Sequence, residues 1–322
     1  MTGCQQHTSH TVRETPTERT DFILNTFVSI KAYDCDDPAI LDEAIALCKE
    51  YESRFSRTIE TSEIYKLNHR SPNEQTFELS PETAELLELA LHYCELSDGA
   101  FDITIEPLSS LWDFTSETPV LPTSASLEQA VKRCGYEKLH LEGDTLTFLS
   151  PDTTIDLGAI AKGYIADKLG EYLRVSGIQS AIINLGGNVL CIGNRPDDTP
   201  FRIGLQKPFA RRSETFEITE ISDMSVVTSG IYERYFTIND TIYHHILNPD
   251  TGYPHDSGLV SVTILSESSA DGDGLSTACF SLGLDKGMEL INSMENVYAC
   301  FIDEHYNVYY SDGMEDFLAD EK

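Results

Sequence analysis

The sequence predicts an α+β fold, in which antiparallel sheets pack against helices. Segments with helical spacing and segments with strand-like alternation occur in blocks along the chain, whereas an α/β fold would alternate them strictly. No internal repeat is visible, which argues against a repeat architecture. The chain has 322 residues, of which 40% are hydrophobic. This length can bury a large core, as one domain or as two closely joined ones.

The first half of the chain predicts amphipathic helices and short strands. Apolar residues recur three or four positions apart in the expected helices, which cover residues 41–55, 81–97, 124–134 and 160–175. Ser80 is expected to cap the second of these helices, and Asp98-Gly99 to end it. Short runs with strand-like composition predict strands over residues 22–32, 138–141, 145–149 and 154–156.

The second half of the chain predicts mainly strands. These are expected over residues 180–185, 189–192, 202–205, 216–221, 224–228, 235–238, 241–243 and 261–265. Two helices follow, over residues 274–281 and 287–293. The chain then closes with a hairpin made of residues 297–302 and 305–310.

The net charge narrows the class of protein. It is −32 at pH 7, and such a charge repels nucleic acid and anionic membranes unless a basic patch offsets it. The sequence contains no such patch, so we expect no nucleic-acid partner. An anionic ligand would also be repelled and would need a local cation or metal ion. Much of the charge lies in runs such as Glu315-Asp316 and Asp320-Glu321, which fit a solvated surface.

The N-terminus allows two interpretations. Thr2-Gly3-Cys4 resembles the end of a lipoprotein signal, but the apolar segment that should precede it is not in the sequence. If the start has been trimmed, Cys4 is a lipid anchor, residues 1–20 are a polar tether, and the domain over 21–322 lies outside the cytoplasm at a membrane. If Cys4 is incidental, a cytoplasmic location stays open. No segment approaches the ~18 apolar residues of a membrane span.

Two segments place charged and hydroxyl groups where a phosphate or a metal ion could bind. In Asp156-Leu-Gly-Ala-Ile-Ala-Lys-Gly-Tyr164, Lys162 lies at the start of a predicted helix, where the helix dipole favours an anion. Asp273 and Thr277 are four residues apart and share one helix face, and Mg²⁺ prefers such hard oxygen ligands. The alternatives are a surface lysine and an aspartate that only caps a helix.

Other motifs either carry a weak signal or are missing. His245 precedes a turn-rich segment and is either a general base or a structural histidine, and Gly186-Gly187 is a tight turn. The sequence has no G-x-S-x-G, H-E-x-x-H, P-loop or G-x-G-x-x-G motif. A calcium loop at Asp271 is rejected, because Leu275 and Leu282 stand where oxygen ligands are needed. The eight cysteines form no C-x-x-C pair and fit buried thiols.

In chain order, the motifs of this sequence resemble those of the ApbE family, the FAD:protein FMN transferases. The resemblance runs from about residue 20 to about residue 310. The matching segments are Leu24-Asn-Thr26, Phe55-Ser-Arg57, Gly99-Ala-Phe-Asp-Ile-Thr104, Asp156-Leu-Gly-Ala-Ile-Ala-Lys-Gly163, Asn184-Leu-Gly-Gly187, Gln206-Lys-Pro208, Thr228-Ser-Gly230, His245-Ile-Leu-Asn-Pro249, Thr251-Gly-Tyr-Pro254 and residues 270–277.

The resemblance implies an ApbE-like, T-fold-like domain with FAD in a cleft between two halves. It implies an enzyme that splits the pyrophosphate of FAD with Mg²⁺ and transfers FMN to a Thr or Ser hydroxyl of a target flavoprotein. The product is a phosphoester, and AMP is released. The acceptor is expected to be a respiratory or extracellular electron-transfer subunit.

The resemblance also implies roles for individual residues. The backbone carbonyl of Ala159, with Asp273 and Thr277, would hold the metal. His245 matches the histidine that deprotonates the acceptor hydroxyl, and Asp273 and Lys162 complete the catalytic set. The residues expected to line the FAD site are Leu24, Ala100, Phe101, Asp102, Asp156, Lys162 and Leu247.

Some positions depart from the family pattern. Leu24-Asn25 stands where relatives have Met-Gly, Thr58 where they have a flavin-contacting tyrosine, and Glu106 where a glycine is common. These departures concern the packing of the flavin and not the metal ligands. Separately, two other functions stay open beside the transferase. One is an FAD pyrophosphatase that uses water as the acceptor, and the other is a non-catalytic lipoprotein that binds FAD.

Overall fold

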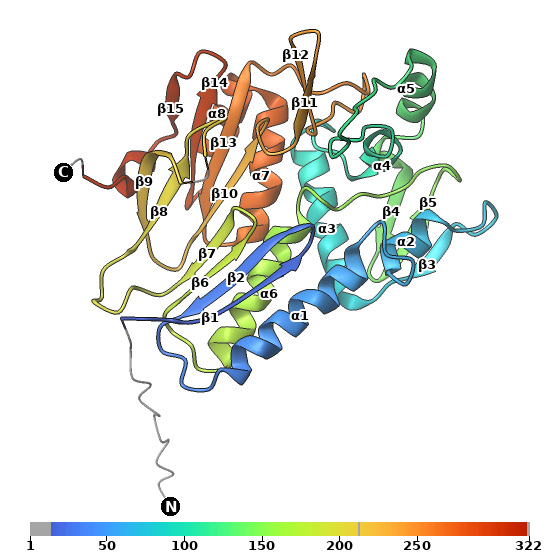
Figure 1. Cartoon of the computed structure of the whole chain (residues 1–322). Coiled ribbons are helices and arrows are strands. Elements are labelled where there is room, and N and C mark those ends of the chain that lie inside the picture. Colours follow the sequence, from blue (N-terminus) through green and yellow to red (C-terminus); the bar gives the residue numbers. More distant parts are fainter. Residues whose placement is uncertain (1–13, 212, 321–322) are drawn as a thin grey trace, which may run out of the picture.

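An eight-stranded antiparallel sheet organises the structure, a computed structural model that describes residues 14–211 and 213–320 (Figure 1). In sheet order its strands are β1 (Thr17–Ile23), β2 (Thr26–Ala32), β6 (Ala181–Leu185), β7 (Asn188–Ile192), β10 (Ser225–Gly230), β13 (Leu259–Ser266), β14 (Val297–Asp303) and β15 (Val308–Tyr310). Neighbouring strands run antiparallel throughout. The predicted α+β class is confirmed.

Helices cover one face of this sheet and bury its main core. They are α1 (Ala39–Phe55), α6 (Ala161–Val175), α7 (Ser269–Leu282) and α8 (Leu284–Asn292). The alternation in β2 explains the burial, because Val28, Ile30 and Ala32 point toward the helices and are fully buried. At β13 every residue is buried, since a second hydrophobic cluster fills the opposite face there.

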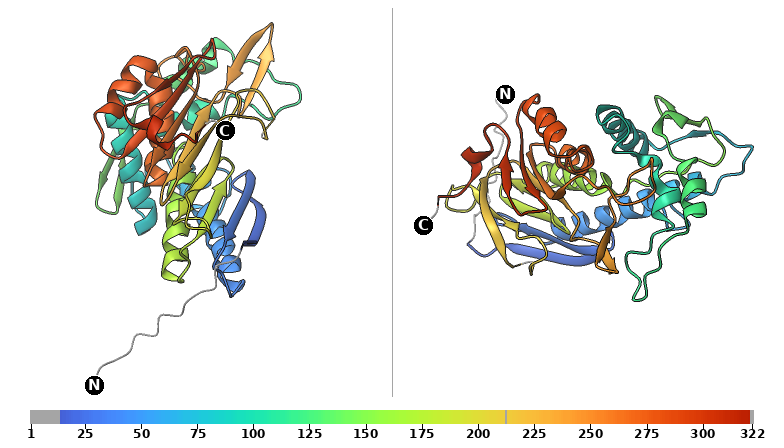
Figure 2. Two further views of the ribbon diagram at one scale, coloured as in Figure 1. Left: turned by 90° about the vertical axis from the view of Figure 1, so that its left-hand side faces the viewer. Right: turned by 90° about the horizontal axis from the view of Figure 1, so that it is seen from above.

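Smaller elements flank the sheet at its two ends (Figures 1 and 2). The hairpin of β8 (Phe201–Gln206) and β9 (Thr215–Ile221) contributes to the second cluster. The remaining α-helices and strands of the described residues are α2 (Glu63–Asn68), β3 (Thr76–Glu78), α3 (Pro81–Leu96), α4 (Glu106–Ser109), α5 (Ser124–Val131), β4 (Leu139–Glu142), β5 (Thr145–Phe148), β11 (Tyr235–Ile238) and β12 (Thr241–His244). The sequence did not predict α2, β3 or α4.

Two predicted strands differ from the structure. The segment 22–32 contains a hairpin rather than one strand, because Leu24 and Asn25 take positive φ angles of 57° and 54° and turn the chain between β1 and β2. The segment 154–156 is not a strand. The side chain of Asn68 pairs with both the N–H and the carbonyl of Ile155 at 2.7 Å, where a neighbouring strand would otherwise pair.

The N-terminal boundary also shifts. The predicted tether covers residues 1–20, but β1 begins at Thr17, so its last four residues belong to the sheet. Cys4 lies outside the described residues. Within the described part of the chain, no helix combines the length and apolar character needed to cross a membrane.

We expect the fold to gain stability as ionic strength rises. A net charge of −32 repels itself in the compact state, and salt shortens the Debye length from about 10 Å at 0.1 M to about 3 Å at 1 M. The ion pairs that salt weakens are mostly exposed, as at Arg202–Glu220, and contribute little. The melting temperature should therefore rise between 0.05 and 1 M NaCl in scanning calorimetry. A constant or falling value would contradict this expectation.

Candidate active site

The site begins where α6 crosses α7. A Cβ atom at Gly163 would lie 2.2 Å from the carbonyl oxygen of Ser269 and 2.7 Å from the Cα of Ala270. Only glycine allows the two backbones to approach this closely. The crossing brings the first turn of α6 beside the first turns of α7, although the two segments are more than a hundred residues apart in sequence.

Lys162 and Asp273 meet at this crossing. The Asp273 carboxylate is 3% exposed. Its Oδ2 accepts a 2.9 Å hydrogen bond from the Gly163 N–H, and its Oδ1 lies 3.3 Å from Lys162 Nζ. The interpretation of Asp273 as a helix cap is wrong, because Ser268 caps α7 and Asp273 lies inside it. Lys162 is likewise not a simple surface lysine, since its side chain is only partly exposed and is paired.

Thr277 lies one helical turn after Asp273, on the same face of α7. Its hydroxyl is 3.0 Å from the hydroxyl of Ser229 in β10, and Ser229 also contacts Ser276 at 2.8 Å. Thr228-Ser-Gly230 is one of the segments that resemble the family, but the sequence alone predicts no role for Ser229. The structure shows that this serine orients the Thr277 side chain.

Asp167 fixes the start of α7 from the neighbouring helix α6. It accepts hydrogen bonds from the N–H groups of Ser269 and Ala270 at 2.8 and 2.9 Å, and from the Ser268 hydroxyl at 3.0 Å. Such helix-start N–H groups have no partner within their own helix. Burial raises the pKa of Asp167, the three hydrogen bonds lower it, and the effect of burial is the larger, so that the pKa is about 6. Sequence spacing gave no sign of this capping.

His245 lies just after β12 and has one ring nitrogen free to act. Its Nδ1 is 3.3 Å from the Arg234 carbonyl oxygen, and a carbonyl can only accept, so Nδ1 carries the hydrogen and Nε2 keeps its lone pair. Loss of surrounding water and, to a smaller extent, the positive charge of Arg234 together lower the pKa of His245 to about 3.

His244 differs from its neighbour. It is buried, its Nε2 donates to the His255 carbonyl oxygen at 3.1 Å, and burial lowers its pKa to about 4. Its ring packs edge-on against Phe280. The sequence could not decide between a base and a structural histidine at this segment, and the structure fits a structural role for His244.

Asp156 is held by a polar cluster that the sequence reasoning did not predict. One carboxylate oxygen lies 3.0 Å from Arg57 Nε and accepts from the Ser109 hydroxyl at 2.8 Å, and the other accepts from the Gly158 N–H at 3.0 Å. Glu106 joins this cluster, 3.6 Å from Arg57. Glu106, which departs from the family pattern, therefore shares the Arg57 guanidinium with Asp156.

The other predicted FAD residues mostly turn their side chains inward. Asp102 accepts from the Thr104 and Tyr136 N–H groups at 2.7 and 3.0 Å, and burial raises its pKa. Phe101 and Leu247 are buried in hydrophobic clusters. These residues can therefore offer a ligand mainly backbone atoms. Leu24 is partly buried at the β1–β2 turn, where its N–H donates to Glu52 at 2.6 Å.

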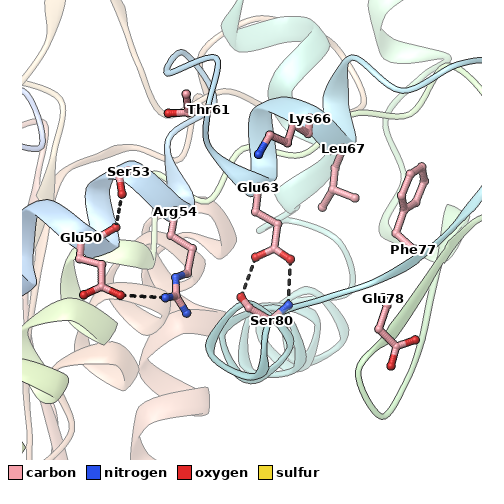
Figure 3. A pocket seen from close by; sticks show the side chains of 10 residues that line it. All are labelled: Glu50, Ser53, Arg54, Thr61, Glu63, Lys66, Leu67, Phe77, Glu78 and Ser80. Carbon is pink, nitrogen blue, oxygen red and sulfur yellow. Dashed lines mark hydrogen bonds and ion pairs between the residues drawn. The ribbon is translucent and has the colours of Figure 1, made fainter.

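The structure has two cavities that we compare with the predicted FAD residues. One of about 650 Å³ contains none of the predicted site residues. Its lining is tied by internal bonds, as where Glu63 accepts from the N–H and hydroxyl of Ser80 at 2.8 and 2.6 Å (Figure 3). A second cavity, of about 610 Å³, is lined by Ala100, by the loop from Asn248 to Asp256 and by Lys286. It adjoins the predicted FAD segments.

The oxygen donors at the α6–α7 crossing fit a hard metal ion. Over residues 14–211 and 213–320, no three His, Cys, Asp or Glu side chains gather as a metal site. The predicted set does not need three such side chains, because it consists of one carboxylate, one hydroxyl and the main-chain carbonyl of Ala159. Mg²⁺ commonly takes one or two carboxylates, with water and substrate phosphates supplying the other ligands.

Comparison with known proteins shows the family of this chain. The model of the ApbE family matches residues 24–302. An FAD:protein FMN transferase of Klebsiella pneumoniae is 34% identical over 288 residues, which cover 89% of each chain. One of Treponema pallidum is 30% identical over 317 residues, covering 92% of this chain and 87% of the relative.

Solved structures show the same fold. The flavin transferase ApbE from Vibrio cholerae superposes with a TM-score of 0.84 at 29% identity, covering 94% of this chain and 98% of the other. The ApbE protein of Thermotoga maritima superposes with a TM-score of 0.85 at 32% identity, covering 95% and 100%. With the sequence match and the shared fold in agreement, the chain belongs to the ApbE family.

Proposed function

We propose that this chain, an FAD:protein FMN transferase, carries out the transfer at the α6–α7 crossing, on a Thr or Ser hydroxyl of an acceptor flavoprotein. The observation that carries the proposal is the buried Asp273 carboxylate, held by Lys162 and the Gly163 N–H beside the hydroxyl-bearing face of α7. Burying a carboxylate costs free energy even when it is paired, and such groups are concentrated at functional sites. The same arrangement places the Lys162 ammonium where it can offset the negative charge of a substrate in an otherwise acidic protein.

Asp273, Thr277 and the Ala159 carbonyl would hold Mg²⁺ in this proposal. The ion would neutralise charge that develops on the diphosphate oxygens during transfer. Lys162 can offer its ammonium to the same diphosphate, since it lies in the first turn of α6, where the helix dipole also favours anions. Ser229 keeps the Thr277 hydroxyl in place.

His245 would accept the proton of the acceptor hydroxyl at Nε2. The hydroxyl oxygen forms a bond to the FMN phosphorus of FAD, the diphosphate bond to the bridging oxygen breaks, and AMP leaves with that oxygen. The lowered pKa keeps His245 neutral at physiological pH, so the lone pair is available. A bound diphosphate places negative charge nearby, which raises the pKa of the ring toward the range of an effective base.

The remaining residues would hold FAD, mainly through backbone atoms. Ala100 begins the segment Ala100–Asp102 and lines the cavity of about 610 Å³, and Leu247 directly precedes the loop from Asn248 that also lines it. Asp156 is oriented by Arg57 and Ser109. Leu24 lies at the β1–β2 turn, where relatives have methionine.

One experiment separates the three candidate functions. The chain is incubated with FAD and Mg²⁺, with and without an apo-flavoprotein subunit of an electron-transfer complex, and AMP and protein-bound flavin are measured. Release of AMP that requires the acceptor, with flavin attached to it, is the expected result. Release without acceptor would indicate a pyrophosphatase, and no release would indicate a binding protein. EDTA should abolish the reaction, and added Mg²⁺ should restore it.

His245→Asn should lower the transfer rate constant by roughly 10²- to 10⁴-fold, the usual contribution of a positioned base. The Michaelis constant for FAD should stay within about twofold, because His245 acts on the acceptor. The matched control is His244→Asn, which should lower the melting temperature while the folded fraction keeps its activity. Equal losses of activity in the two variants would contradict the assignment.

A further inference from the structure

Two hairpins beside the candidate site carry exposed apolar side chains. On the outer face of the β1–β2 hairpin, Phe22 is 61% exposed and Phe27 is 70% exposed. The two are paired across the strands, with ring centroids 5.5 Å apart in an edge-to-face arrangement. Leu24, predicted to lie near the flavin, is in the turn between them. Exposed apolar side chains that are gathered into one patch often mark a site of protein interaction.

The β11–β12 hairpin carries the second group. Tyr235 and Ile242 are exposed on it, and Phe209 packs edge-on against Tyr235 with ring centroids 5.4 Å apart. The opposite face of this hairpin is buried through Phe236, which packs on Trp112. His245 follows β12 directly. Both hairpins project on the same side of the molecule (Figure 2). We call Phe22, Phe27, Phe209, Tyr235 and Ile242 the hairpin surface.

The charge pattern sets the β1–β2 part of this surface apart from the rest of the chain. Within β1 and β2, Glu18 and Asp21 are balanced by Arg19 and Lys31, so the hairpin carries no net charge in a chain of −32. These charges are also paired, Lys31 with Glu18 at 3.5 Å and Lys49 with Asp21 at 2.5 Å. A partner docking here meets apolar rings without the repulsion that the acidic surface exerts elsewhere.

We propose that the hairpin surface is the docking site for the acceptor protein, which contacts it through apolar side chains that flank the target hydroxyl. The proposal rests on the transferase function, because a transferase that modifies proteins must bind its acceptor next to the transferring site. The β11–β12 hairpin leads into His245, the proposed base, and the β1–β2 hairpin carries Leu24, which the family resemblance places near the flavin. Exposed aromatic residues are the side chains that most often dominate protein interfaces.

The test uses the double variant Phe22→Thr and Phe27→Thr in the full chain. Threonine keeps the preference for β-structure, and the exposed rings contribute little to the core. The matched control is Val308→Thr, an exposed apolar residue of β15 at the opposite edge of the same sheet. The probe is an apo-flavoprotein subunit that the wild-type chain modifies, assayed at saturating FAD. FAD affinity is measured separately by quenching of flavin fluorescence.

We expect kcat/KM for the acceptor to fall roughly tenfold or more in the Phe22/Phe27 variant, with FAD affinity within about twofold of wild type. The control should match wild type. Because the contact is apolar, 0.5 M NaCl should not raise the Michaelis constant for the acceptor. An unchanged kcat/KM for the acceptor would overturn the proposal, as would equal losses in the control variant or a parallel loss of FAD affinity.

Other occupants of the hairpin surface give a different result. If a second copy of the chain covers it, the Phe22/Phe27 variant changes the oligomeric state in sedimentation while kcat/KM for the acceptor stays constant. Failure of the transferase function itself is distinguishable, because the wild-type chain would then attach no flavin to the acceptor.

Discussion

Replacing Asp273 by asparagine should reduce FMN transfer roughly a thousandfold. The carboxylate would hold the metal, and loss of several kcal/mol of charge stabilisation in the transition state corresponds to about three factors of ten in rate. Asparagine has the same shape, and its amide oxygen can still accept the hydrogen bond from the Gly163 N–H. Lys162 is partly exposed and can turn to solvent. The melting temperature should therefore change by only a few degrees.

The control for this variant is Asp271→Asn. Asp271 lies in the same helix, but its carboxylate accepts a 2.7 Å hydrogen bond from the Tyr93 hydroxyl, whereas Asp273 is paired with Lys162 and Gly163. Steady-state rates with FAD and acceptor, measured at several Mg²⁺ concentrations, compare the two variants. Full activity in Asp273→Asn with an unchanged Mg²⁺ requirement would remove Asp273 from the metal site.

Replacing Gly163 by alanine should disrupt both the fold and the site. The added methyl group would lie 2.2 Å from a backbone oxygen of α7, and backbone cannot move aside as a flexible side chain can. We expect the free energy of unfolding to fall by about 3 kcal/mol or more, which exceeds the roughly 1 kcal/mol that alanine gains in a helix. Separation of α6 from α7 should also remove most FMN transfer, because Lys162 would no longer reach Asp273.

Gly170→Ala is the matched control in the same helix. There an added methyl group would lie 3.0 Å from the end of the Leu190 side chain and 3.3 Å from the end of Arg174, and both side chains can shift. Its effect on the free energy of unfolding, measured by urea titration, should stay within about 1 kcal/mol. Similar decreases in the free energy of unfolding in the two variants would show that the close contact between α6 and α7 at Gly163 is not the cause of the instability.

The sequence predicted the elements whose signals are local. The amphipathic helices α1, α3 and α6 were found close to their observed bounds, because apolar spacing dictates which face is buried. The two strand errors have different origins. The turn at Leu24-Asn25 lacks the glycine that usually marks such a turn, and the Asn68 side chain that replaces a strand partner at Ile155 lies far away in sequence.

The candidate site was predictable in its residues but not in its geometry. Helical spacing placed Asp273 and Thr277 on one face, whereas the choice between a cap and a ligand needed the true start of α7 at Ser269. Asp167, Arg57 and Ser229 were missed because each acts through a contact distant in sequence. A single sequence carries no record of such contacts.

The bond from the Gly163 N–H to Asp273 has a consequence for folding kinetics. An N–H group in the first turn of a helix has no partner within that helix, so an isolated α6 would exchange this proton with solvent freely. In the native chain its protection depends on a carboxylate 110 residues further along. Hydrogen exchange at this one amide therefore reports when the last third of the chain has docked, and with it when the protein first becomes able to bind its substrate.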